Sequence, residues 1–482
     1  MSTPPPDSVR PIYLNGEWND QGPPLDVINP STGEVFAKVS TVDQAGTKQA
    51  IADAEAAWAD WRNLTGKERG AYLHAIADGI EKRAEDIART ITLENGKPLA
   101  QGKGEVGMTV DHFRWFAEEA KRAYGRVIPN QLEDKRHLAI RQPVGVVGAI
   151  APWNFPLVLA VRKVAPALAA GCPVLLKPAS ATPLNSVLLA EAVHEAQLPK
   201  GVFQLLVGNA REIGAEMMAN PSCRKITFTG STEVGRELIR QSADEVKKLS
   251  MELGGHAPVI IFDDANLENA VEGALITKFR NAGQSCIASN RIYVQRGIYD
   301  AFIESFVEKA SAMKVGDGLE DGVDIGPLID EAAVDTALTH IEAATQSGAK
   351  LLCGGKRPDG LGPSFLEATV LTDVPEDTLC MKEETFAPVA PVAVFDEEDD
   401  VIQRANDTEY GLAAYVFTEN LNRAWRVAEA LEAGTVGVND AVPATSQCPF
   451  GGMKQSGLGR ELGTEGLDGF LETKHISFGQ IS

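Results

Sequence analysis

Residues 225–242 have the sequence KITFTGSTEVGRELIRQS, which contains the local pattern that decides the fold. A short strand-forming run from Lys225 to Thr229 passes through Gly230 into a helical pattern from Thr232 to Ser242. A strand that enters a helix through a glycine turn is a unit of α/β folds. Backbone N–H groups at such a helix start favour phosphate oxygens, but a tight structural turn accounts for the glycine equally well.

The same alternation of strand and helix extends to both sides of this unit. Before it we predict strands at Val144–Ile150, Pro173–Lys177 and Val202–Val207 and helices at Leu157–Ala170, Pro183–Ala196 and Ala210–Ala219; after it, a strand at Val246–Ser250. A second series continues to about Asn439 and begins with strand Val259–Phe262, helix Leu267–Arg280 and strand Arg291–Gln295. Apolar strands without polar alternation fit parallel sheets covered on both faces. The sequence therefore predicts two α/β domains in succession, with a boundary near Gly254-Gly255.

The first 130 residues have a different organisation. Pro11–Asn19 predicts a hairpin that turns at Asn15-Gly16. Apolar residues at helical spacing then predict three helices, which we place at Gln44–Trp61, Lys67–Glu94 and Val110–Tyr124.

Size and charge exclude several classes of function. A chain of 482 residues is expected to form two or three domains of ~100–200 residues each. Its net charge of −22 opposes binding to a phosphate backbone, so we expect no nucleic-acid partner. Its first residues lack the apolar core of a signal peptide, and no apolar run has the ~20 residues of a membrane span. We expect a cytoplasmic protein without a membrane partner.

The six cysteines are scattered, without a CxxC pair, and the seven histidines show no metal-ligand spacing. We expect reduced thiols and no metal site, because a chain of this length does not need disulfides for stability.

Four residues at predicted strand or helix ends have side chains that suit catalysis, and each has a purely structural alternative. Asn154 can donate to an oxyanion or cap a helix, and Lys177 can bind a ligand or face solvent. Cys286 follows the small residues Asn281-Ala282-Gly283, but a lone cysteine is usually a small core residue. Glu252 is either a strand-edge residue or a base with a raised pKa.

Seven motifs together decide between these alternatives. In order and spacing, including the 34 positions from Glu252 to Cys286 (286 − 252), they resemble those of the aldehyde dehydrogenase superfamily, and most closely its succinate-semialdehyde dehydrogenases. The motifs are PWNFP (152–156), LLKPAS (175–180), FTGSTEVG (228–235), MELGGHAP (251–258), NAGQSC (281–286), EETFAP (383–388) and PFGGMKQSG (449–457).

The resemblance implies a particular α/β architecture, with a Rossmann-type cofactor domain, a catalytic domain and a small oligomerisation sheet. Residues 1–122 and 143–252 would form the NAD(P)-binding domain, 253–448 the catalytic domain, and 123–142 with 449–482 the oligomerisation segments. In this family a C-terminal stretch such as Gly469–Gly479 pairs with a segment such as Leu138–Gln142 and extends a sheet across subunits. A homodimer or homotetramer is therefore expected.

The resemblance also implies a mechanism. Cys286 corresponds to the nucleophile that attacks the aldehyde carbon, the Asn154 amide and the Cys286 N–H to the oxyanion hole, and Glu252 to the base that activates water. The cofactor would be held by Trp153, Lys177, Ser180, Gly230, Ser231, Leu253, Glu384 and Phe386. Members of the family often have Glu at the position of Ser180 when they are strict for NAD. A hydroxyl can hydrogen-bond a 2′-phosphate, whereas a carboxylate repels it. We therefore expect the enzyme to accept NADP, and the same argument allows a preference for NADP over NAD.

Two arginines match positions at which the semialdehyde class binds the distal carboxylate of its substrate. They are Arg162 and Arg280, and a forked guanidinium suits a carboxylate, although each could instead pair with a nearby acid. Ser446 lies in the segment where the class often carries a substrate-binding serine. Succinate semialdehyde is the first expectation; 2-oxoglutarate semialdehyde, glutarate semialdehyde, a general aldehyde, or a catalytically silent structural relative are the alternatives.

Overall fold

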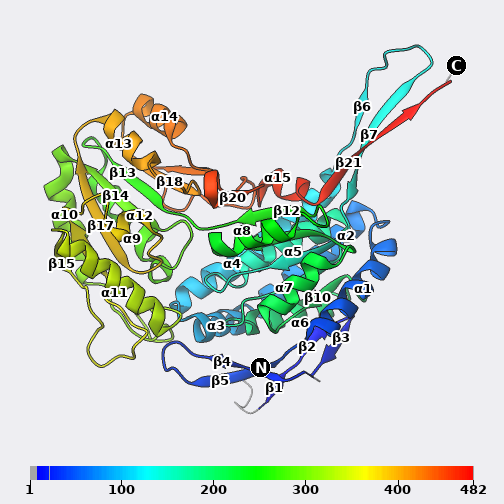
Figure 1. Ribbon diagram of the computed structural model, residues 1–482, viewed down its shortest axis with the longest axis horizontal. Coiled ribbons are helices and arrows are strands. Elements are labelled where there is room, and N and C mark those ends of the chain that lie inside the picture. The colour runs from blue at the N-terminus through cyan, green and yellow to red at the C-terminus, as the bar shows by residue number, and fades with distance from the viewer. Residues whose placement is uncertain (1–7, 21, 481–482) are drawn as a thin grey trace.

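Two predominantly parallel sheets form the centre of the computed structural model, which describes residues 8–20 and 22–480 (Figure 1). The first sheet has the strand order β10-β9-β8-β11-β12-β20, and only the last strand runs antiparallel to its neighbour. Its strands are β8 (Val146–Ile150), β9 (Val174–Lys177), β10 (Phe203–Leu205), β11 (Cys223–Thr229), β12 (Lys248–Glu252) and β20 (Gly457–Leu458). The α/β alternation predicted on both sides of residues 225–242 is therefore confirmed.

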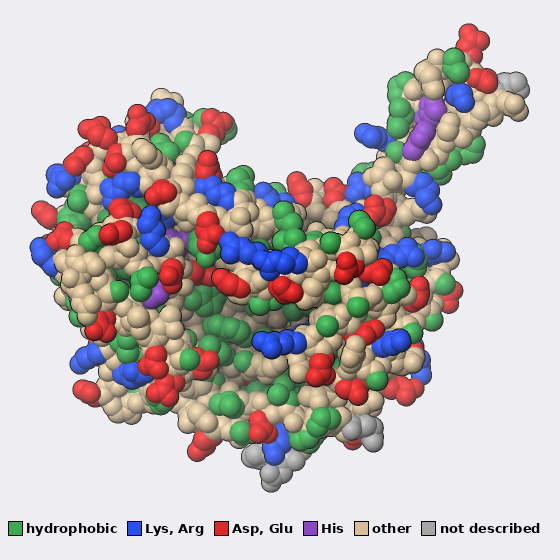
Figure 2. Space-filling model, in the orientation of Figure 1, with side chains coloured by type: hydrophobic (Ala, Val, Ile, Leu, Met, Phe, Trp, Pro, Cys, Tyr) green, Lys and Arg blue, Asp and Glu red, His purple; other side chains and the backbone are tan. Residues whose placement is uncertain are grey.

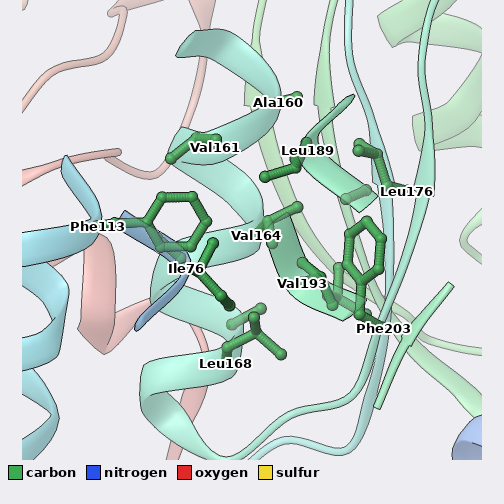
Figure 3. Close-up of a cluster of buried hydrophobic side chains, with 14 of the residues drawn as sticks. Ile76, Phe113, Ala160, Val161, Val164, Leu168, Leu176, Leu189, Val193 and Phe203 are labelled. Atoms are coloured by element: carbon green, nitrogen blue, oxygen red, sulfur yellow. The ribbon is translucent and has the colours of Figure 1, made fainter. Parts of the chain in front are cut away.

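The α-helices described for this half of the chain are numbered α1 to α8. They are α1 (Gln44–Trp61), α2 (Gly66–Lys82), α3 (Ala84–Asn95), α4 (Leu99–Glu119), α5 (Val158–Ala170), α6 (Leu184–Glu195), α7 (Ala210–Ala219) and α8 (Thr232–Gln241). Helix α5 lies at the centre of the packing: every one of its residues is buried. In Figure 3 its side chains Val161, Val164 and Leu168 lie between Phe113 and Ile76 on one side and Phe203 of β10 on the other. Burial on all sides explains why α5 is mostly apolar instead of amphipathic; its two charged residues, Arg162 and Lys163, are buried as well.

The second sheet has the order β15-β16-β17-β14-β13-β18-β19 and is parallel except for β15. Its strands are β13 (Ala257–Ile261), β14 (Ser289–Gln295), β15 (Lys350–Cys353), β16 (Thr369–Thr372), β17 (Val389–Phe395), β18 (Ala413–Phe417) and β19 (Thr435–Val438). The helices of this half are α9 (Leu267–Phe279), α10 (Arg296–Ser311), α11 (Glu331–Gln346), α12 (Leu379–Lys382), α13 (Glu398–Asn406) and α14 (Leu421–Ala430). The predicted fold class of two parallel-sheet units is confirmed.

A third, antiparallel sheet projects from the body as an arm (Figures 1 and 2). It consists of β6 (Arg126–Ile128), β7 (Arg136–Pro143) and β21 (Leu471–Phe478), and β21 pairs with β7 from Leu471 opposite Pro143 to Phe478 opposite Arg136. The predicted pairing of the C-terminal segment with residues 138–142 is confirmed within one chain. Its extension across subunits stays a prediction.

The N-terminal strands form two small sheets. The predicted hairpin is confirmed as β2 (Ile12–Leu14) and β3 (Glu17–Asn19), which are joined through Asn15 and Gly16, both at positive φ. Strand β1 (Val9–Arg10) pairs with β5 (Val35–Ser40), which also pairs with β4 (Pro24–Ile28). Among residues 8–20 and 22–480, no helix has both the length and the apolarity needed to cross a membrane.

Three predicted elements are wrong in their bounds. The helix predicted at 110–124 is α4, which begins at Leu99 and ends at Glu119. The helix predicted at 67–94 is two helices, because Arg83 leaves the helical conformation (φ −104°, ψ 13°) while the apolar spacing continues across the break. The strand predicted at 246–250 is β12, Lys248–Glu252, because Val246 has a positive φ of 49° that a strand cannot contain. Glu252 is therefore the last residue of a strand, not a residue that follows one.

The predicted domain ranges stay a prediction. They depend on the point at which the chain changes sheets, which lies between the end of β12 at Glu252 and the start of β13 at Ala257.

Candidate active site

Four of the sequence motifs meet at one edge of the first sheet. Strands β9, β8, β11 and β12 are neighbours in that order and run parallel, so their carboxyl ends lie side by side. Lys177 ends β9, Trp153 and Asn154 follow β8, Gly230 follows β11, and Glu252 ends β12. Ligands of open α/β sheets bind at this edge. Residues up to 99 positions apart in the sequence (252 − 153) are thus brought to a single site.

Cys286 is brought to this edge by an unusual backbone path. After α9, Asn281 and Ala282 have positive φ angles of 53° and 55°, and Gly283 follows at 75°. The chain at Gly255 runs against this turn so closely that a Cβ on Gly255 would lie 2.1 Å from the Cys286 carbonyl oxygen. The glycine between β12 and β13 is needed for this close approach. The thiol of Cys286 stays partly exposed.

The environment of Cys286 and Glu252 favours their neutral forms. Burial and then the negative charge of Glu252 raise the pKa of the Cys286 thiol well above its usual range. Burial and then the charge of Glu461 raise the pKa of Glu252. Neither carboxyl oxygen of Glu252 has a hydrogen-bond partner among the described residues. An unpaired buried carboxyl group beside a thiol can accept a proton from it or from a water molecule.

Asn154 is held through its backbone while part of its side chain is left unpaired. Its carbonyl oxygen accepts from the Lys97 ammonium at 2.8 Å and from the Asn281 amide at 2.8 Å. Its own Nδ2 donates to the Gln284 carbonyl at 3.2 Å. The structural alternative, a helix N-cap, is wrong, since α5 has no side-chain cap. Asn154 instead lies directly against the segment that carries Cys286.

The sequence analysis missed the buried pair that supports Asn154. The Lys97 ammonium lies 2.6 Å from a Glu105 carboxylate oxygen, and both side chains are fully buried. The other oxygen of Glu105 accepts from the backbone N–H groups of Leu157 at 2.9 Å and Val158 at 3.2 Å, at the start of α5. A single pair thus fixes both Asn154 and the first turn of α5. A charged residue on an otherwise buried helix face is the only signal that the sequence offers.

A second group of residues missed in the sequence lies behind Glu252. The Lys163 ammonium of α5 pairs with the Glu461 carboxylate and hydrogen-bonds the Thr229 hydroxyl at 2.5 Å. The Glu461 charge raises the pKa of Glu252, whereas the Lys163 charge lowers it. These two charges therefore act in opposite directions on the protonation of Glu252.

The predicted cofactor residues surround the same edge. Lys177 is 4% exposed, and no described carboxylate pairs with it; burial lowers its pKa to about 8. Glu384 accepts from the Gly255 N–H at 3.1 Å, and burial raises its pKa to about 8. Phe386 has a φ of 51° and packs edge-on against Trp153, with 5.6 Å between ring centroids.

Helix α8 starts beside these residues. The Ser231 side chain accepts from the Val234 N–H at 3.4 Å as the N-cap, and the Gly230 N–H donates to the Glu252 carbonyl. A Cβ on Gly235 would lie 2.4 Å from Leu253, so α8 packs directly on the residue after β12. Ser180 lies partly exposed in the loop after β9. The cofactor contacts of Gly230, Ser231, Leu253 and Ser180 stay predictions.

The two predicted substrate arginines approach the site from different halves of the chain. Arg162 of α5 is 7% exposed, and its guanidinium lies 4.7 Å from the Phe450 ring centroid. Arg280, directly after α9, lies 5.1 Å from the Phe155 ring. The alternative that each pairs with an acid is wrong: neither forms an ion pair within residues 8–20 and 22–480, and Arg162 Nε has no partner there. The charge of Arg162 acts on both Arg280 and the Cys286 thiol.

Ser446 is buried and already bonded. It is 2% exposed, donates to a carboxylate oxygen of Asp111, and lies 2.7 Å from Nδ1 of His112. Both partners are on α4, which the sequence analysis did not connect with the site. Its predicted contact with a substrate stays a prediction.

Comparison with known proteins identifies the family to which this site belongs. The model of the aldehyde dehydrogenase family matches residues 18–476. The chain belongs to this family. It is an oxidoreductase that acts on an aldehyde with NAD(P) as its cofactor.

Its similarity to individual members of the family covers almost the whole chain. It is 49% identical over 471 residues to a glutarate-semialdehyde dehydrogenase of Pseudomonas aeruginosa, covering 97% of each chain. It is 49% identical over 468 residues to the NADP(+) succinate-semialdehyde dehydrogenase of Escherichia coli, again covering 97% of each. A crystal structure of an E. coli NADP-dependent enzyme superposes with a TM-score of 0.96 at 49% identity, covering 98% of each chain.

The residues present fit a bound NAD(P). The buried amine of Lys177 and the partly buried carboxyl group of Glu384, neither in an ion pair among the described residues, suit ribose hydroxyls, which both donate and accept. The N-terminus of α8 has the positive dipole end that would suit a phosphate group of the cofactor.

Proposed function

We propose that this enzyme oxidises an aldehyde that carries a carboxylate at its far end, with succinate semialdehyde as the first candidate. One observation carries the proposal: Arg162 is buried and Arg280 half-buried, neither forms an ion pair within residues 8–20 and 22–480, and the charge of Arg162 acts on both Arg280 and the Cys286 thiol. Burying an unpaired charge is costly unless a ligand neutralises it. A distal carboxylate on the substrate supplies that charge and can bind each guanidinium through paired hydrogen bonds.

In the proposed reaction, Cys286 forms the bond to the aldehyde carbon. Deprotonation of its thiol gives the nucleophilic thiolate, and Glu252 lies close enough to change the pKa of that thiol. The Asn154 amide and the Cys286 N–H stabilise the oxyanion of the thiohemiacetal, an interaction whose loss typically costs about 2.7–4 kcal/mol in barrier height. Bound NAD(P) supplies the hydride acceptor.

Hydrolysis of the resulting thioester completes the proposed cycle. Glu252 takes a proton from water, which then attacks the acyl carbon and releases the acid and the Cys286 thiol. The raised pKa of Glu252 suits this step, because a base with a pKa nearer to neutrality both accepts and returns a proton readily.

Glutarate semialdehyde is the second candidate, because a relative of that name is as similar to this chain as the succinate-semialdehyde dehydrogenase is, at 49% identity. Both substrates end in a carboxylate and differ by one methylene. A methylene in an apolar pocket changes discrimination by only about 1–3 kcal/mol.

We further propose that NADP is accepted and preferred. Ser180, two positions after Pro178 in the loop that follows Lys177, offers a hydroxyl instead of a carboxylate to a 2′-phosphate. The names of the E. coli relative and of the superposed E. coli structure both include NADP.

We also propose that the enzyme works as a homodimer or homotetramer. The arm exposes large apolar side chains on its strands and at its tip, which a partner subunit would cover: Tyr124 is 73%, Val127 78%, Leu132 54% and Phe478 46% exposed (Figure 2). A monomer in light scattering would contradict this.

Steady-state kinetics with a panel of aldehydes and both cofactors tests the substrate proposal. The panel contains succinate semialdehyde, glutarate semialdehyde, acetaldehyde and betaine aldehyde. We expect the two carboxylated aldehydes to have the highest kcat/KM. A higher kcat/KM for acetaldehyde or betaine aldehyde would refute the proposal.

A further inference from the structure

A chain of three polar side chains lies near Arg162, one of the two arginines proposed to bind the carboxylate, and the charge of Arg162 acts on one of them, His112. Ser446, in the 439–453 loop, donates its hydroxyl proton to Asp111 and lies 2.7 Å from Nδ1 of His112. Asp111 and His112 are consecutive residues of α4, which packs against α5 and its Arg162. His112 is 2% exposed.

The hydrogen bonds determine which nitrogen of His112 carries a proton. Asp111 is exposed, and its carboxyl oxygen Oδ2 accepts from the Ser446 hydroxyl. The single hydroxyl proton of Ser446 therefore goes to Asp111, so that Ser446 Oγ must accept from Nδ1–H of His112. Burial and the charge of Arg162 lower the pKa of His112 well below its usual range, which keeps the imidazole neutral. A neutral imidazole has one N–H, and Nε2 is consequently left as an acceptor.

This acceptor has no partner among the described residues. His112 Nε2 and Arg162 Nε are both buried and without a hydrogen bond. One is an acceptor and the other a donor, and the charge of Arg162 acts on both His112 and Cys286. Asn154 Oδ1 and both carboxyl oxygens of Glu252 are unpaired in the same way. Unpaired buried polar atoms are uncommon, and a bound ligand is one way in which such atoms gain a partner.

We propose that His112 determines substrate specificity by accepting a hydrogen bond from a hydroxyl group on the carbon next to the distal carboxylate. The hydroxyl would donate to Nε2 of His112 and accept from the guanidinium of Arg162. This inference rests on the proposed function, in which Arg162 and Arg280 bind that carboxylate. It names the substrate class as 2-hydroxy acids that end in an aldehyde.

The direction of the hydrogen bond distinguishes 2-hydroxy substrates from two chemically similar substrates, the unsubstituted and the 2-oxo semialdehydes. An unsubstituted semialdehyde leaves Nε2 without a donor. A 2-oxo semialdehyde has only lone pairs at that carbon and directs them at the lone pair of Nε2. The 2-hydroxy compound is therefore favoured over both.

Three aldehydes of one chain length test the proposal: 5-oxopentanoate, its 2-hydroxy derivative in both enantiomers, and 2,5-dioxopentanoate. We expect the better 2-hydroxy enantiomer to exceed the unsubstituted aldehyde in kcat/KM by about tenfold, as one buried hydrogen bond allows. We expect the 2-oxo compound to fall below the 2-hydroxy compound by at least as much.

Substitutions of His112 and Asp111 test whether these residues recognise the substrate hydroxyl or only hold the 439–453 loop in place. His112→Phe should reduce the hydroxyl-to-unsubstituted ratio to about one. In Asp111→Asn, the amide can donate to Ser446, whose proton then turns to Nδ1 of His112 and leaves Nε2–H as a donor. That variant should prefer the 2-oxo compound over the 2-hydroxy compound. Each ratio is measured on one preparation, so a general loss of activity cancels.

Trp115→Phe is the matched control. Trp115 Nε1 donates to the Gly463 carbonyl at 3.3 Å, and the Gly463 N–H donates to the Ser446 carbonyl at 2.9 Å, so this contact also ties the loop to α4. The control should leave the ratio unchanged.

Equal kcat/KM for hydroxylated and unsubstituted aldehydes in the wild type, or an unchanged ratio in His112→Phe, would overturn the inference alone. If no carboxylated aldehyde is oxidised better than acetaldehyde, the proposed function fails and this inference fails with it.

Discussion

The carboxyl group of Glu252, at the end of strand β12, raises the pKa of the Cys286 thiol, which lies in the segment between α9 and β14. Cys286 in turn lowers the pKa of Glu252, so each residue changes the protonation of the other. The pH at which the Cys286 thiol reacts therefore reports on its interaction with Glu252.

Glu252→Gln should lower the pH at which Cys286 becomes reactive. The wild-type carboxylate raises the thiol pKa, and a neutral amide removes that effect, so the thiolate forms at lower pH. The rate of alkylation by iodoacetamide, measured against pH, should shift its midpoint downward. Glu465→Gln, at an exposed position of α15 (Gly463–Asp468), serves as the control. A midpoint that stays in place or rises would show that Glu252 does not act on the thiol.

Arg162→Gln and Arg280→Gln should each reduce kcat/KM for succinate semialdehyde by roughly 10- to 150-fold, because a hydrogen bond to a charged group contributes about 1.5–3 kcal/mol. Propanal has no carboxylate, so its kcat/KM should change by less than about threefold on the same argument. Arg426→Gln is the control, since Arg426 is exposed and pairs with Glu398. Equal losses for both aldehydes would contradict a role in binding the carboxylate.

Ser180→Glu should shift cofactor preference from NADP toward NAD. A carboxylate beside the ribose repels a 2′-phosphate and can accept from the 2′-hydroxyl of NAD instead. The ratio of kcat/KM for the two cofactors measures the shift, which should be at least about tenfold, or 1.4 kcal/mol. Ser180→Ala lacks the repulsion and should change the ratio less. A wild-type enzyme that strongly prefers NAD would refute the cofactor proposal.

Much of the fold follows from local sequence, whereas contacts between side chains that are far apart in the sequence do not. The strand, the glycine and the helix at residues 225–242 are local, and the structure has β11, Gly230 and α8 there. Motifs also predicted that Asn154, Lys177, Glu252 and Cys286 gather at one place. Sequence could not indicate that Ser446 bonds His112, because 334 positions separate them and only packing of the loop on α4 brings them together.

The errors have a common physical cause. The apolar spacing of 67–94 continues through Arg83, which breaks the helix and pairs with Glu191 of α6. Val246 is β-branched and suits a strand by its residue type, but its side chain is 88% exposed and its φ is positive. In both cases the contacts between elements override a local pattern, so a pattern predicts the type of an element better than its ends.

Gly255→Ala should lower kcat by about a hundredfold or more, because the new Cβ would lie 2.1 Å from the Cys286 carbonyl oxygen and must displace the nucleophile. Gly104→Ala on α4 is the matched control, since a Cβ there has no described atom within 4 Å. The control should keep full activity and raise the free energy of unfolding by about 0.5–1 kcal/mol. Full activity in Gly255→Ala would mean that the Cys286 segment is not fixed by this contact.

Lys97→Met should reduce the free energy of unfolding by about 3–5 kcal/mol, because it leaves Glu105 as an unpaired charge in a fully buried position. It should also lower kcat, since Lys97 donates to the backbone of Asn154 at 2.8 Å. Urea unfolding followed by circular dichroism measures the first effect, and saturating kinetics measures the second.

Two further variants distinguish the effect of the buried Lys97–Glu105 pair on stability from its effect on catalysis. Lys103→Met breaks the exposed pair between Lys103 of α4 and Glu85 of α3 and should cost less than about 1 kcal/mol. The double variant Lys97→Met with Glu105→Leu removes both buried charges and should recover stability relative to Lys97→Met. It should not recover kcat, because Asn154 and the start of α5 still lack the hydrogen bonds of Lys97 and Glu105. Recovery of both quantities would show that the pair supports the fold alone and does not position Asn154.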